Sequence, residues 1–128
     1  MGTCVAIDLT WMDDCIEVHV DGDFPNQMVA MNKAITGDPR HKKISRMLIN
    51  ALDADHFYAD DHLVGTMAEM DVMAYDGAPR MRLAVVTDNP KMARIVQTYA
   101  AHYESLKPGA VVSKVFDNLA EARTWLGT

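Results

Sequence analysis

The chain has 128 residues, of which 49% are hydrophobic and 23% charged, the composition of an ordinary globular domain with a core of its own. Its formal net charge of −6 argues against a nucleic-acid or anionic-membrane binder, because such partners are held by a basic face. No apolar segment approaches the ~20 residues of a membrane span and the N-terminus lacks a secretory pattern, so we expect a cytoplasmic protein.

The two cysteines, Cys4 and Cys15, fall on successive strands of a predicted hairpin without facing each other directly. We therefore expect two free thiols in a reducing compartment, and no Cys-x-x-Cys or Cys/His spacing indicates a zinc site. The one basic cluster, PRHKKISR at 39–46, lies in a polar stretch before a strand. We interpret it as a solvated loop and strand edge rather than as a phosphate site.

The chain opens with two segments, 3–9 and 15–21, in which apolar and polar residues alternate. This period is typical of strands with one buried face, and the TWMDD between them has the chemistry of a turn, so we expect a hairpin near a sheet edge. A helix should follow, with Asp23 as its cap and Gly37 at its end. Its apolar side chains recur at helical spacing: Phe24, Met28, Met31 and Ile35.

Strands and helices then alternate to the end of the chain. Segments 45–52, 81–87 and 111–116 predict strands, and the apolar run MLI in the first suits burial on both faces. The expected helix caps are Asp60 or Asp61, then Asn89, then Asp117 or Asn118. The three helical stripes are Leu63, Met67, Met70 and Ala74; then Met92, Ile95, Val96, Tyr99 and Tyr103; then Leu119, Ala122 and Leu126.

The element order is therefore ββαβαβαβα. Strands separated by helices run parallel through right-handed crossovers, so the last four strands should be parallel and the hairpin should leave the first strand antiparallel. No internal repeat, low-complexity tract or linker interrupts the chain. We predict a single α/β domain over 1–128 with a mixed, mostly parallel five-stranded sheet.

Two stretches of the C-terminal half carry a recognisable sequence pattern: RLAVVTDNPKMARIVQTYAAHYES at 82–105 and KVFDNLAEARTWL at 114–126. They resemble the SpoIIAA-like branch of the STAS-domain superfamily, also called STAS/SEC14-like. In that branch a strand ending in Val-Phe-Asp leads into a final helix of the form Leu-x-Glu-Ala-x-x-Trp-Leu. The resemblance implies the STAS fold and a regulatory module that binds other proteins rather than catalysing a reaction.

The best-known relatives are anti-anti-sigma regulators, which carry an Asp-x-Ser at the end of the third strand and are phosphorylated on that serine. In this chain Asp53-Ala54-Asp55 stands at that place, so Asp55 occupies the serine position. No Ser or Thr occurs from 50 to 65. The resemblance therefore implies a module without the phospho-acceptor, in which the Asp55 carboxylate would supply a fixed but weaker negative charge.

An acidic segment, NALDADHFYADDH at 50–62, follows the third predicted strand. We expect it to form a loop at the carboxyl end of a parallel strand, which is where open α/β sheets bind ligands. The predicted partner-binding or switch loop consists of Asp53, Asp55, His56, Tyr58, Asp61 and His62.

The same segment allows two other interpretations. Asp53, Asp55 and His56 are weak candidates for a metal site, because mixed Asp and His ligands suit zinc, iron or manganese, but their spacing matches no known site. His56 or His62 beside an Asp would form an acid/base pair, yet no activated nucleophile or phosphate-binding loop accompanies it. We therefore predict neither metal nor cofactor, and keep a metal-dependent enzyme as the third alternative.

Ten methionines are many for this length. Methionine is flexible and polarizable, so a cluster of methionines adapts to varied ligands, although helix stripes facing a sheet are usually core. A candidate apolar pocket is formed by Met28, Met31, Met67 and Met70, and we expect Met73 to widen the apolar face toward a neighbouring helix.

The leading hypothesis is a non-enzymatic cytosolic regulatory or interaction module with a protein partner. The alternative is a carrier or sensor of a small apolar, lipid-like ligand held beneath the methionine-bearing helices. The exposed edge of the first strands permits a homodimer but does not require one.

Overall fold

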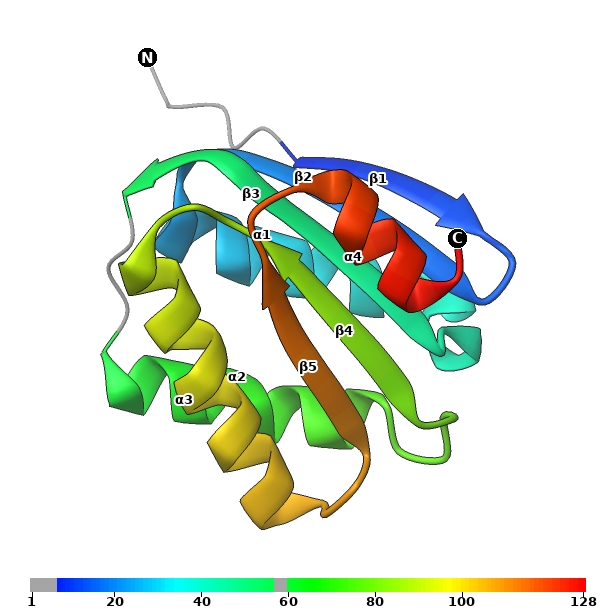
Figure 1. The fold of residues 1–128 in the computed structure, drawn as a ribbon. Coiled ribbons are helices and arrows are strands. Elements are labelled where there is room, and N and C mark those ends of the chain that lie inside the picture. Colours follow the sequence, from blue (N-terminus) through cyan, green and yellow to red (C-terminus); the bar gives the residue numbers. More distant parts are fainter. Residues whose placement is uncertain (1–6, 57–59) are drawn as a thin grey trace.

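The structure, a computed structural model, describes residues 7–56 and 60–128, and within them 23–27, 29, 55 and 56 by backbone alone. Its five strands are β1 (Ile7–Met12), β2 (Cys15–Asp23), β3 (Arg46–His56), β4 (Met81–Val86) and β5 (Val111–Phe116). They form one sheet in the order of the chain, with β1 and β5 at its edges (Figure 1). β1 pairs antiparallel with β2 and the other pairs are parallel, which confirms the predicted mixed sheet.

The helices are α1 (Phe24–Thr36), the short 3-10 helix η1 (Pro39–Lys43), α2 (Asp61–Ala74), α3 (Pro90–Leu106) and α4 (Leu119–Leu126). α1, α2 and α3 cover one face of the sheet and α4 covers the other (Figure 1). This succession confirms the predicted order ββαβαβαβα. None of the helices in the described part of the chain combines the length and the hydropathy of a membrane span.

The sheet separates two cores. On β3, Met47 and Ile49 lie in the large core beneath α1, α2 and α3, while Leu48 between them lies in a smaller core beneath α4. All three side chains are buried, which confirms that the MLI run belongs to a strand covered on both faces. α4 closes the smaller core with Ala122 and Leu126.

The first hairpin turns within two residues, because Met12 pairs directly with Cys15. Asp13 takes a left-handed conformation there, with φ at 49°, which Asp tolerates better than most side chains. The predicted turn was therefore too long, since β1 continues to Met12. Cys15 is a buried free thiol, and Cys4 lies outside the described residues.

β3 continues beyond its predicted end at residue 52, as far as His56. β2 extends beside it, and the two strands remain paired up to Asp23 and His56 across two shifts of register. The prediction of a loop immediately after residue 52 was therefore wrong. Pairing with β2 extends β3 through polar residues. The register shifts interrupt the alternation of apolar and polar residues by which this part of the strand could have been predicted.

Three helices begin at residues that the sequence predicted as caps. Asp60 Oδ1 accepts the backbone N–H of Leu63 at 2.8 Å at the start of α2. Asn89 caps α3 ahead of Pro90, and Asn118 caps α4. Each cap satisfies a backbone N–H that the helix itself cannot pair, so the local sequence fixes where these helices start.

The basic cluster differs from its prediction as a solvated loop, because His41 is only 7% exposed within η1. Its Nδ1 lies 2.7 Å from the carbonyl oxygen of Asp38, and its Nε2 lies 3.0 Å from that of Ala74. The ring also meets Tyr75 edge-on, with the centroids 5.5 Å apart. His41 therefore anchors this segment to the end of α2.

Candidate functional site

The structure describes three side chains of the predicted partner-binding loop, and these lie on two different elements. Asp53 lies on β3, whereas Asp61 and His62 are exposed in the first turn of α2. Tyr58 lies outside the described residues, as do the side chains of Asp55 and His56. Among the side chains that the structure describes, which exclude Asp55 and His56, no three His, Cys, Asp or Glu lie close enough together to hold a metal ion.

Asp53 instead pairs with a histidine from the neighbouring strand. His19 Nε2 on β2 lies 2.7 Å from Asp53 Oδ2, and both side chains are partly exposed. The pair shares the α4 side of the sheet with Glu17, which binds Arg123 of α4. The acid/base pairs predicted from the sequence used His56 or His62, so this pairing was missed. Parallel register brings His19 and Asp53 together from two strands. The only signal in the sequence was that His19 stands between the apolar residues Val18 and Val20 in an alternating segment.

The inner side of α2 carries a carboxylate. Val64, Met67 and Ala68 are the buried residues of the helix, and Asp71 follows Met67 one turn later on the same side. Asp71 lines the cavity beneath the helix, whereas the predicted stripe placed Met70 there. That stripe joined apolar residues only, so it passed over the one charged residue that faces inward.

The predicted surroundings of Met70 and Met73 were therefore wrong. Met70 is 42% exposed and does not line the cavity, and Met73 is 73% exposed rather than packed on a neighbouring helix. His62, Thr66 and Glu69 are exposed on the same side of α2. These five residues form what we call the outer face of α2.

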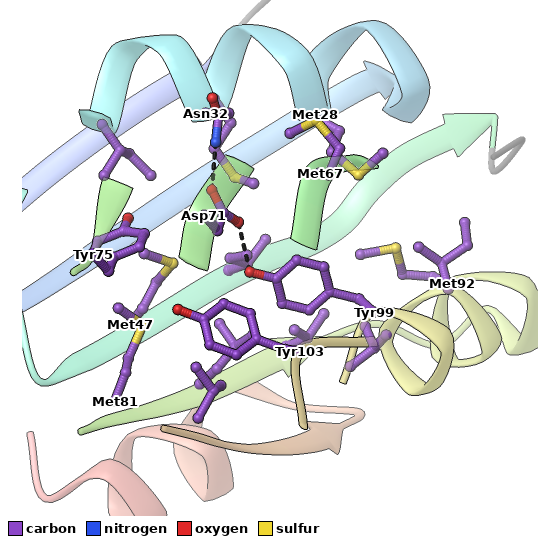
Figure 2. Close-up of a pocket in the computed structure, with 18 residues that line it drawn as sticks. Met28, Asn32, Met47, Met67, Asp71, Tyr75, Met81, Met92, Tyr99 and Tyr103 are labelled. Carbon is purple, nitrogen blue, oxygen red and sulfur yellow. Dashed lines mark hydrogen bonds between the residues drawn. The ribbon is translucent and has the colours of Figure 1, made fainter. Parts of the chain in front are cut away.

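A cavity of about 80 Å³ lies between the sheet and the layer of α1, α2 and α3 (Figure 2). Its walls are almost entirely apolar. Of the predicted pocket residues, Met28, Met31 and Met67 line it. The six methionines around it are Met28, Met31, Met47, Met67, Met81 and Met92.

A short polar network crosses this apolar cavity (Figure 2). Asn32 Nδ2 of α1 donates to Asp71 Oδ1 at 2.5 Å, and Tyr99 Oη of α3 donates to Asp71 Oδ2 at 2.5 Å. Burial raises the pKa of Asp71 to about 6, although both hydrogen bonds act in the opposite direction by favouring the ionised form. Burial also raises the pKa of Tyr99 well above its usual range, so its hydroxyl remains a donor.

Sequence reasoning missed this network. The available signal was the position of Asp71, four residues after Met67 and four before Tyr75, on the apolar side of a helix. Its partners Asn32 and Tyr99 lie far away in the chain, so only the packing of three helices brings them together. A buried carboxylate with a raised pKa in a cavity is a common mark of a functional site.

The fold of this chain is similar to that of a protein of known structure. In structure the chain is similar to the anti-sigma factor antagonist SpoIIAA in its unphosphorylated form, with a TM-score of 0.57 and 11% sequence identity. The match covers 93% of this chain and 94% of that chain. Neither a protein-family model nor a curated protein matches the sequence. The chain has the STAS/SpoIIAA-like fold.

Proposed function

We propose that this chain is a non-enzymatic protein-interaction module and that the outer face of α2 is its partner-binding surface. The observation that carries the proposal is the adjacent pair Met70 and Met73, two large apolar side chains held in solvent one helical turn apart. The fold supports it as well, because SpoIIAA, described as an anti-sigma factor antagonist, has the same architecture.

The chemistry of the outer face indicates the kind of partner. Met70 and Met73 offer an adaptable apolar centre, which suits a surface that accommodates varied side chains. Asp61 and Glu69 are exposed on the same helix, and α2 contains no Lys or Arg. A complementary partner would present an apolar residue flanked by basic ones, since opposite charges steer association and fix its register.

Regulation by a phosphoserine at the end of β3 is not part of this proposal. The resemblance places Asp55 at that position, and Asp55 lies near the end of β3, between Ala54 and His56, which both pair with β2. We propose that the module binds its partner constitutively or under another control. Replacing Asp55 with Ser and exposing the protein to a cognate kinase would test whether a switch can be restored.

The first experiment places a photo-crosslinking amino acid at Met73 in the full chain and irradiates it in cells that express it. A matched probe at Val112, which is 46% exposed on β5, reports non-specific capture. We expect a protein that is crosslinked from Met73 and not from Val112. Equal capture from both positions would contradict a binding surface on α2.

The identified protein is then purified and its affinity for the chain is measured by titration calorimetry. Met70→Glu with Met73→Glu should weaken binding by at least roughly tenfold, about 1.4 kcal/mol, because both methionines lose their apolar contact. The control Leu106→Glu with Val112→Glu changes two similarly exposed apolar residues elsewhere and should leave the affinity unchanged. Equal losses in both double variants would count against the outer face.

A further inference from the structure

A second hollow adjoins the methionine-lined cavity. It is a cleft of about 350 Å³ at the end of the sheet where β4 and β5 begin, between the segments 75–81 and 107–111. The cleft and the cavity share four wall residues, which lie where the two meet: Tyr75, Met81, Tyr103 and Val111. The cavity is therefore adjacent to a wider, more polar cleft, which we call the entrance.

The positions of side chains along α2 and α3 determine which of them lie nearer the cleft and which lie deeper in the cavity. Tyr75 and Asp71 are one turn apart along α2, and Tyr103 and Tyr99 are one turn apart along α3. Figure 2 shows Tyr75 and Tyr103 near Met81, with the Asp71–Tyr99 hydrogen bond further along the cavity. A molecule that enters from the cleft would first pass the two tyrosines and only then reach Asp71.

The entrance is basic. Arg80 and Lys107 both line the cleft, and Arg80 Nε donates to the carbonyl oxygen of Gly109 at 2.8 Å, which holds the side chain in place. Neither cation forms an ion pair with a carboxylate of the described residues. The nearby Glu104 carboxylate accepts the N–H of Gly109 at 3.0 Å. The cleft therefore presents two positive charges without an opposite charge bound to them.

We propose that the cleft and the cavity together form one binding site for an anionic amphiphile, namely a carboxylic acid with a short apolar chain. Arg80 and Lys107 hold the carboxylate, because a guanidinium matches the two oxygens of a carboxylate and an ammonium adds charge. The chain passes between Tyr75 and Tyr103 into the methionine-lined cavity, where it is removed from water.

The position of Asp71 fixes the orientation of the bound acid. Both carboxylate oxygens of Asp71 already accept hydrogen bonds, from Asn32 and from Tyr99, so the ligand need not supply a donor. A second carboxylate beside Asp71 would be repelled and would lack a cation. The anionic group therefore stays at the entrance and the apolar end points inward.

The volume of the cavity limits the chain. About 80 Å³ is close to the space of three water-sized groups at roughly 30 Å³ each, so a short chain fits without rearrangement. Six flexible methionines line the space, and their side chains can move to admit a few further carbons. We expect affinity to rise from acetate to octanoate and to stop rising for palmitate.

The ligand series is tested by titration calorimetry with the purified full chain and no protein partner, so its outcome is independent of the interaction proposed above. Octanoate should bind, acetate should bind at least about tenfold more weakly, octanol should bind more weakly than octanoate, and octylamine should not bind. Octylamine binding as tightly as octanoate would overturn the proposal. Octyl phosphate binding more tightly than octanoate would overturn the choice of a carboxylate.

The basic entrance is tested by Arg80→Gln with Lys107→Gln. This double variant should weaken octanoate binding at least about tenfold and leave octanol binding unchanged, since only the charge contact is lost. The control is Lys91→Gln with Arg94→Gln, which removes the same charge from two exposed positions near the start of α3. Equal octanoate affinity in both double variants, or no binding of any acid to the unmodified chain, would overturn the proposal.

Discussion

Tyr99 of α3 donates a hydrogen bond from its hydroxyl to Oδ2 of Asp71 on α2, at 2.5 Å, inside a cavity whose walls are otherwise apolar. Asn32 of α1 binds the other oxygen of the same carboxylate. One carboxylate thus joins three helices at a single polar point. Hydrogen bonds in such a low-dielectric place fix the arrangement of their elements, because losing one partner leaves a buried polar group unpaired.

The first prediction concerns Tyr99→Phe. At pH 8 the variant should lose about 1–3 kcal/mol of unfolding free energy, because ionised Asp71 loses a donor and remains buried. The loss should be smaller at pH 4.5, where a larger share of Asp71 is protonated and tolerates the apolar ring better. Urea denaturation at the two pH values measures both quantities.

Tyr103→Phe is the matched control for this substitution. Tyr103 lies one turn along α3 and is buried, but its hydroxyl makes no hydrogen bond with any described residue. Its removal should change stability by less than about 0.5 kcal/mol. A loss from Tyr103→Phe as large as that from Tyr99→Phe would show that ring packing, and not the contact with Asp71, accounts for the effect.

The second prediction concerns the pH dependence that Asp71 confers. Its folded pKa of about 6 lies above its ordinary value of 3.8, so between these values the folded chain holds more protons than the unfolded chain. The contribution of Asp71 to stability is therefore full below pH 3.8 and is lost as the pH rises through about 6. Asp71→Asn removes this titration. The unfolding free energy of the variant, relative to that of the unmodified chain, should therefore rise between pH 4 and pH 8 by up to roughly 3 kcal/mol.

The difference between the two unfolding free energies, measured at several pH values, tests this directly, because other titrating groups cancel in the difference. A difference that stays constant from pH 4 to pH 8 would mean that Asp71 titrates normally. A difference that changes in the opposite direction would mean that hydrogen bonding outweighs burial and that the folded pKa of Asp71 is lowered.

Local chemistry predicted much of this fold. Asn89 before Pro90 marked the start of α3, the MLI run marked a strand buried on both faces, and the segment Val111–Phe116 was a strand over its whole predicted length. These features depend on neighbours in the sequence, on periodicity and on capping. They need no knowledge of which distant residues meet.

The candidate site depends on distant residues and was predicted poorly. Three of the four predicted pocket methionines do line the cavity, but Met70 is replaced there by Asp71, whose partners come from other helices. The burial of His41 rests on a carbonyl of Ala74 in the same way. From sequence alone a polar side chain is predicted to be exposed, because the distant residues that satisfy its hydrogen bonds in the folded chain are unknown.

The third prediction compares two methionines. Met92 of α3 is 2% exposed and lines the cavity, so Met92→Ala should cost about 2–5 kcal/mol by lost burial and an enlarged void. Met73→Ala, at a position that is 73% exposed, should change stability by less than about 0.5 kcal/mol. Thermal and urea unfolding of both variants measure the contrast. Similar costs at the two positions would contradict the assignment of Met73 to the outer face of α2.

The fourth prediction concerns the contact between α2 and α3 at Gly65. A Cβ at this position would lie 3.1 to 3.4 Å from three atoms of the His102 ring, closer than side chains normally approach. Glycine within a helix costs about 1 kcal/mol relative to alanine, so the helix itself favours Gly65→Ala. His102 is exposed and can rotate away at small cost. We therefore expect Gly65→Ala to stabilise the chain by roughly 0.5 kcal/mol, and by more in a His102→Ala background.

A double-mutant cycle separates the two contributions, because the coupling between Gly65→Ala and His102→Ala measures the cost of moving the ring. Destabilisation by Gly65→Ala in the chain with His102, together with stabilisation in the chain with His102→Ala, would show that the ring is fixed between the helices. Destabilisation in both chains would mean that the backbones of α2 and α3 approach too closely for any side chain at residue 65. In that case Gly65 would set the distance between the two helices, and with it the width of the cavity beside Asp71 and Tyr99.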